Sequence, residues 1–123
     1  MGTTFDSLAA VRPHLIWTGA RARAVEGGRI TLAVVDLDPS SEVPEHSHDN
    51  EQVGLVLKGA ITMRVAGEAR LLGPGETYVI PGGVPHSAAA GPAGASVVDT
   101  FSPVRADWAQ VERGEPSPGM WPG

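Results

Sequence analysis

Cysteine is absent from this chain of 123 residues, which excludes disulfide bonds, thiolate metal sites and a cysteine nucleophile. Positive charge is also scarce: Lys58 is the only lysine, the arginines are scattered, and the net charge is −5. Nucleic acid is therefore not an expected partner, because phosphate binding needs a basic patch. The chain has neither an apolar run long enough to cross a bilayer nor a signal-peptide pattern at its start. We therefore expect no membrane association and a cytoplasmic location.

Glycine and proline are abundant, by contrast, with 16 and 11 copies that punctuate the sequence at short intervals. Proline at this density forbids long helices in the middle of the chain. Between these breaks lie short runs rich in valine, isoleucine, leucine and threonine, at 29–37, 52–58, 60–66, 76–81 and 95–101. This pattern predicts an all-β sandwich or barrel.

The whole chain, residues 1–123, is expected to form a single domain with its barrel core at about 18–103. The two ends differ from the core. Short helical turns are expected within 3–12 and near 107–111. The tail from residue 103 onward is rich in proline and glycine, and its last residues, 114–123, are expected to be an irregular, loosely packed arm.

The alternation of side chains along residues 52–58 indicates a strand that is covered on both sides. Successive residues of a strand face opposite sides of the sheet. One face carries Val53, Leu55 and Leu57, and the other carries Gln52, Gly54 and Val56. If the second face lines the interior, the first is an apolar outer face that needs a cover. We expect a second copy of the chain to supply it, in a homodimer.

Three histidines and a glutamine form a candidate metal site. His46 and His48 fall on one side of an extended chain, and the same parity turns Gln52 rather than Glu51 to that side. His86 follows a Pro-Gly-Gly turn and a further proline, which fix the path of the backbone. Three imidazoles and an amide oxygen suit one divalent first-row transition metal, namely nickel, zinc, manganese or iron. The alternative is that these histidines are core or surface residues satisfied by hydrogen bonds.

The spacing of these residues resembles that of the cupin family. The positions that match its two motifs are His46, His48, Gln52 and Gly59 in the first, and Gly75, Pro81, Gly83 and His86 in the second. The match covers residues 40–90, and both motifs at their proper spacing are far more specific than either alone. The resemblance implies a double-stranded β-helix, the cupin jelly-roll, with the metal inside the barrel and frequent dimerisation.

Two positions depart from the usual pattern of the family. Gln52 stands where a glutamate ligand is usual, and Ala90 stands where an asparagine often closes the second motif. A neutral glutamine leaves a bound divalent ion with its full charge, which makes the ion a stronger Lewis acid but holds it less tightly. Carboxylates help to stabilise higher oxidation states of a metal, so the glutamine favours rearrangement over oxygen chemistry.

A carboxylate later in the chain is the candidate proton carrier. Asp99 interrupts an apolar strand and shares a face with Val97 and Phe101, which is costly unless the carboxylate faces a polar cavity or has a partner. The alternative is a strand-end carboxylate that caps a turn or pairs with an arginine. The segments 46–59 and 99–108 together resemble small cupins that act on 4,5-unsaturated uronates in pectin and alginate breakdown.

This second resemblance implies a role for each matching residue. It makes His46, His48, Gln52 and His86 the metal ligands, Asp99 the acid/base, and Phe101 and Arg105 the residues that shape the pocket or meet the substrate carboxylate. Arginine suits that task because of its bidentate fork, although Arg105 could equally pair with Asp107. Arg21 and Arg23 are further candidates for substrate binding, but alternating Arg-Ala is also typical of a solvated strand face. The fourth histidine, His14, has no partner nearby in sequence and is expected to be structural or exposed.

The same residues leave other functions open. Glutamine at this ligand position and the FSP-x-R pattern at 101–105 also occur in small cupins of aromatic polyketide cyclisation. A non-catalytic metal- or sugar-binding cupin and a dioxygenase are further alternatives. Several basic groups around the metal would favour a uronate, and an aromatic-lined pocket would favour a polyketide. The leading hypothesis is a metal-dependent, non-redox isomerase that opens the ring of a small oxygenated substrate such as a 4,5-unsaturated uronate.

Overall fold

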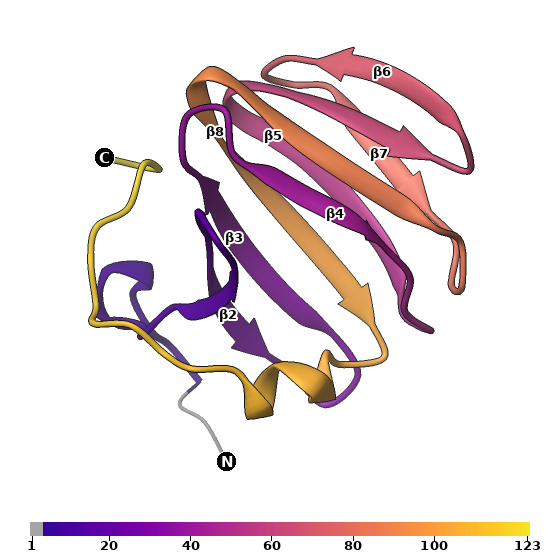
Figure 1. Ribbon diagram of the computed structural model, residues 1–123. Helices are drawn as coiled ribbons and strands as arrows, with labels where there is room; N and C mark the ends of the chain where they lie inside the picture. Colours follow the sequence, from indigo (N-terminus) through magenta and orange to yellow (C-terminus); the bar gives the residue numbers. More distant parts are fainter. Residues whose placement is uncertain (1–3) are drawn as a thin grey trace.

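The computed structural model describes residues 4–123, and most of them lie in antiparallel strands (Figure 1). The first three residues of the expected domain, and the first residue of the helical turn expected at 3–12, lie outside this range. The strands are β1 (His14–Trp17), β2 (Ala20–Glu26), β3 (Thr31–Leu37), β4 (Glu42–His46), β5 (Glu51–Val65), β6 (Glu68–Leu72), β7 (Thr77–Ile80) and β8 (His86–Ser102). Two 3-10 turns, η1 (Leu8–Ala10) and η2 (Ala106–Gln110), lie where short helical turns are expected. Within residues 4–123 no helix is long and apolar enough to span a membrane.

Two long strands, β5 and β8, run through both layers of the fold (Figure 1). The first layer has the order β1-β2-β3-β8-β5-β7, and the second has the order β4-β8-β5-β6. The register between β5 and β8 shifts around Gly59, which is the corner between the layers. Gly59 has φ 73°, and a Cβ there would overlap the carbonyl oxygen of Gly94, so the corner accepts glycine alone without strain.

The predicted all-β jelly-roll is confirmed. Apolar side chains from both layers meet between them and form one core, with Val35, Val56, Ile61, Ile80 and Val97 among its buried members. The breaks expected between the runs 52–58 and 60–66 and before the run 95–101 are wrong. Residues 58–59 and 91–94 bend β5 and β8 without ending them. Glycine at a barrel corner turns a strand while its neighbours keep their ladder hydrogen bonds, so the sequence signals of a bend and of a turn are alike.

The C-terminal arm, residues 114–123, is irregular as expected, but the prediction that it packs loosely is wrong, because hydrogen bonds hold residues 118–121. Arg23 on β2 donates to the carbonyl oxygens of Pro118 (2.9 Å) and Trp121 (2.8 Å). Lys58 on β5 donates to the carbonyl oxygen of Met120 at 2.7 Å. The arm therefore crosses the outer face of the first layer and satisfies charges that it buries there.

Candidate metal centre

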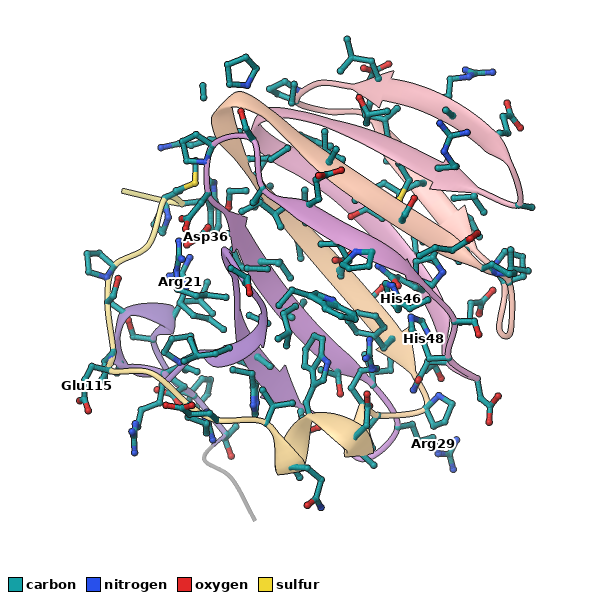
Figure 2. All side chains as sticks on the ribbon, viewed as in Figure 1. Arg21, Arg29, Asp36, His46, His48 and Glu115 are labelled. Atoms are coloured by element: carbon teal, nitrogen blue, oxygen red, sulfur yellow. The ribbon has the colours of Figure 1, made fainter. Side chains whose placement is uncertain are left out.

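The three histidines of the two motifs meet at one end of the barrel. His46 ends β4 and is the register partner of His86, the first residue of β8, while His48 follows in the β4–β5 loop. Their ring centroids lie 4.3 Å (His46–His86), 4.9 Å (His48–His86) and 5.7 Å (His46–His48) apart. Figure 2 shows His46 and His48 side by side between the layers. One nitrogen from each ring lies within 4.8 Å of the others, so the cluster is able to hold a metal ion.

Each of the three rings is oriented by its other nitrogen. Nδ1 lies 2.8 Å from the carbonyl oxygen of Pro44 in His46, 3.1 Å from that of Asn50 in His48, and 2.8 Å from that of Val84 in His86. A carbonyl oxygen only accepts, so Nδ1 carries the proton and Nε2 presents a lone pair. The turn before His86 is fixed to the other ligand segment, because Gly83 donates its N–H to the His48 carbonyl oxygen at 2.8 Å. Backbone contacts of this kind set the tautomer and direction of metal-binding imidazoles.

The acceptor atoms at the centre of the cluster fit a cation. Nε2 of His86 is buried and has no hydrogen-bond partner among residues 4–123. Oε1 of Gln52 lies 3.1 Å from Nε2 of His48, so two acceptors face each other with no proton between them. Burial is the main cause that lowers the pKa of His48 and of His86, which keeps both rings neutral and able to bind a metal. The prediction that Gln52 rather than Glu51 faces the cluster is also confirmed. Gln52 is buried and lines the pocket, whereas Glu51 is exposed on the other side of the strand.

Asp99 lines the same pocket as His46, His86 and Gln52. Its side chain is only 6% exposed, and Tyr78 donates a hydrogen bond to its Oδ1 at 2.7 Å. Burial raises the pKa of Asp99, while the hydrogen bonds from Tyr78 and Gln52 and the charge of Arg105 act in the opposite direction. A carboxyl group with a raised pKa, next to a metal-type cluster, is suited to carry a proton.

Residues 33–101 match the model of the cupin domain. The chain belongs to the cupin family. The resemblance to small cupins of pectin breakdown is confirmed by a curated relative, the pectin degradation protein KdgF of Dickeya dadantii (strain 3937). The two are 34% identical over 64 residues, which are 51% of this chain and 58% of that protein, so the match spans little more than half of the relative.

Two solved cupin structures superpose on most of this cupin. The RmlC-like cupin from Shewanella frigidimarina NCIMB 400 has a TM-score of 0.81 at 26% identity, over 87% of this chain and 96% of that one. KdgF from Halomonas sp. has a TM-score of 0.77 at 28% identity, over 87% of this chain and 98% of that one. The fold thus extends well beyond the region matched by the domain model.

Arg105 of this cupin both lines the pocket and pairs with Asp107, which were the two alternatives expected from the sequence. Its Nε and Nη2 donate to the two carboxylate oxygens of Asp107 at 3.0 and 2.9 Å. Its guanidinium carbon also lies 4.7 Å from the ring centroid of Phe101 and 4.6 Å from that of Trp108, and the residue lines the pocket. The ion pair and the two aromatic rings hold Arg105 at the pocket wall with Phe101 beside it.

The cupin barrel does not bring Arg21 and Arg23 to the pocket. Arg21 pairs with Asp38 at 2.8 Å on the surface, and buried Arg23 lies 3.6 Å from Asp36 beneath the C-terminal arm. Figure 2 shows Arg21 and Asp36 near that arm, away from His46. Both arginines extend from the outer face of β2, because Ala22 between them points into the core. The structure thus gives no support to their expected role in substrate binding.

Three aromatic residues of the site, Trp17, Tyr78 and Trp108, are not among the site residues predicted from the sequence. Tyr78 could have been found by parity, since it shares the inner face of β7 with Ile80. Trp17 lies at the mouth with its ring centroid 5.2 Å from that of His46, and a bulge in β1 turns both Ile16 and Trp17 toward the pocket. A bulge of that kind leaves no sequence signal. His14 packs against Trp108 outside the cluster, with centroids 5.7 Å apart.

Proposed function

We propose that this cupin is a metal-dependent, non-redox isomerase that opens the ring of a 4,5-unsaturated uronate or a closely related small oxygenated substrate. The observation that carries the proposal is a buried carboxyl group, Asp99, in one pocket with a neutral amide and two imidazoles of the three-histidine cluster. The KdgF relatives support it through the pectin degradation named for one of them. A cytoplasmic location remains an expectation.

The residues that would hold the ion are His46, His48, Gln52 and His86. A divalent transition metal in their midst supplies Lewis-acid polarisation of substrate oxygens. The chain itself contributes orientation and proton transfer. Phe101 and Trp108 form an apolar wall, which excludes water from one side of the pocket. Nε and Nη2 of Arg105 are engaged by Asp107, which leaves Nη1 to meet a substrate carboxylate.

The proton balance of ring opening needs a single acid/base group. Asp99 donates its proton to C4 of the C4=C5 double bond, and a C–H bond forms there. C5 and the ring oxygen attached to it become a ketone. The bond between that oxygen and the hemiacetal carbon breaks. The hemiacetal hydroxyl returns its proton to Asp99 and becomes an aldehyde. No atom is gained or lost and nothing is oxidised, so the reaction is an isomerisation.

A cyclase acting on an aromatic polyketide is the second candidate, and one observation favours it. Trp17, Phe101 and Trp108 give the pocket three aromatic walls, whereas Arg105 is the one cationic side chain lining it among residues 4–123. Aromatic walls favour a flat ring system, and a single arginine suits a monocarboxylate. The uronate proposal takes precedence because it uses Arg105 and the relatedness to KdgF together.

The deciding experiment combines metal analysis with turnover. The purified protein should contain about one divalent ion per chain and should abolish the ultraviolet absorbance of a conjugated 4,5-unsaturated uronate. Asp99→Asn should reduce turnover by at least ~100-fold with unchanged metal content, because the amide has no acidic proton to transfer. Full activity in Asp99→Asn would refute the role of Asp99. A metal-loaded wild-type protein that is inert toward the uronate would refute the function and direct assays to polyketides, oxygen uptake and simple ligand binding.

A further inference from the structure

Tyr78 reaches across a neighbouring strand to touch Asp99. Tyr78 lies on β7, Asp99 lies on β8, and β5 runs between them. Gly54 of β5 is the register partner of both residues, so the three form one row across the first layer. A Cβ on Gly54 would overlap the ring of Tyr78 and Oδ1 of Asp99. Glycine at this position opens a gap in the middle strand, and the Tyr78 hydroxyl uses it to reach the carboxyl group.

The contact is a buried polar pair inside an apolar barrel. Tyr78 is 8% exposed, and its hydroxyl lies 2.7 Å from Oδ1 of Asp99. Placing a carboxyl and a hydroxyl group here costs free energy compared with two apolar side chains of the same shape. A pair that served stability alone would not need to line the pocket beside Gln52. The geometry therefore points to a role in what the pocket binds or converts.

We propose that Tyr78 is the positioning residue for Asp99. Its hydroxyl holds Oδ1 and so fixes how the carboxyl group is turned toward the ligand. When Asp99 gives up its proton, a negative charge forms on a buried group, and a hydrogen bond to an ionised acceptor is stronger than one to a neutral acceptor. Tyr78 thus assists the chemical step more than substrate binding. The catalytic part of this inference rests on the proposed isomerase function, and the contact itself does not.

The kinetic test is the substitution Tyr78→Phe, which removes only the hydroxyl. We expect kcat to fall about 10- to 100-fold, as on loss of one hydrogen bond to a charged group, with KM within about twofold and metal content unchanged. The matched control is Ser96→Ala. Ser96 donates a buried hydroxyl hydrogen bond of 2.9 Å to Asp36 in the same layer but on its outer face, so its loss should leave kcat unchanged.

A spectroscopic test is independent of turnover, because Tyr78 is the only tyrosine in the chain. Protein labelled with carbon-13 at tyrosine Cζ gives a single resonance, which reports on hydrogen bonding of the hydroxyl. Asp99→Leu removes the acceptor and should move this resonance, whereas Ser96→Ala should not. An unmoved resonance in Asp99→Leu, or a Tyr78→Phe kcat within twofold of wild type, would overturn the proposal. If the wild-type protein does not convert the uronate, the proposed function fails, and the tyrosine resonance still decides whether Tyr78 holds Asp99.

Discussion

At the scale of single residues, the site depends on which side chains are kept neutral. A charged imidazole cannot bind a metal, and a charged carboxylate cannot donate a proton. Burial favours the neutral form of both kinds of group, because it lowers the pKa of His48 and His86 and raises the pKa of Asp99. Gln52 adds no charge to this arrangement. A glutamate at position 52 would place a second carboxylate beside Asp99.

The lowered pKa values of His48 and His86 predict how metal binding depends on pH. Protons compete with the ion for Nε2, so affinity falls as pH falls through the pKa of each ligand. Burial holds the pKa of His48 and His86 below the usual 6.5, so occupancy should stay complete at pH 6.5 and above and decline only at more acidic values. Metal content after dialysis at a series of pH values measures this. Metal loss that is already complete at pH 6.5, or retention unchanged at pH 4, would contradict it.

At the scale of elements, the corner of β5 offers a test of close backbone approach. Gly59 and Gly67 both have positive φ, 73° and 85°. A Cβ at Gly59 would overlap Gly94, whereas a Cβ at Gly67 would meet no other described residue within 4 Å. Gly67→Ala should cost ~1 kcal/mol of unfolding free energy from backbone strain alone. Gly59→Ala should cost at least ~2 kcal/mol more, because the two layers must separate at the corner. Denaturant unfolding of both variants gives the comparison, and equal losses would show that the corner yields without cost.

The strand pattern explains what could be predicted from the sequence and what could not. Parity counted from His46 and His48 placed Gln52 inward and Glu51 outward, and both residues lie as predicted. The Tyr78–Asp99 contact depends on the registers of β7 and β8 against β5, and no local pattern contains them. The partners of Arg23 could not be predicted for the same reason. Its partners are carbonyl groups of residues 118 and 121, nearly a whole chain length away.

At the scale of the whole molecule, one apolar surface has no cover within the described chain. A row of register partners crosses the outer face of the first layer: Val25 on β2, Leu32 on β3, Thr100 on β8, Val53 on β5 and Val79 on β7. Its four aliphatic members are 44%, 41%, 43% and 58% exposed in that order. The C-terminal arm covers the neighbouring part of this face at Arg23 and Lys58 but leaves the row open. Contiguous exposed apolar surface of this kind is typical of an interface between proteins.

The expected homodimer would bury this row against its copy, since a two-fold interface joins the same patch on both subunits. Sedimentation at micromolar concentration should therefore give a dimer for the wild-type chain. Val53→Asp places a charge at the centre of the row and should shift the protein to a monomer, because an unpaired buried charge costs several kcal/mol. The matched control is Leu71→Asp, which changes an even more exposed aliphatic residue (70%) on β6, outside the row, and should leave the dimer intact. A compact wild-type monomer would rule out the dimer, and a dimer that survives Val53→Asp but not Leu71→Asp would move the interface to the second layer.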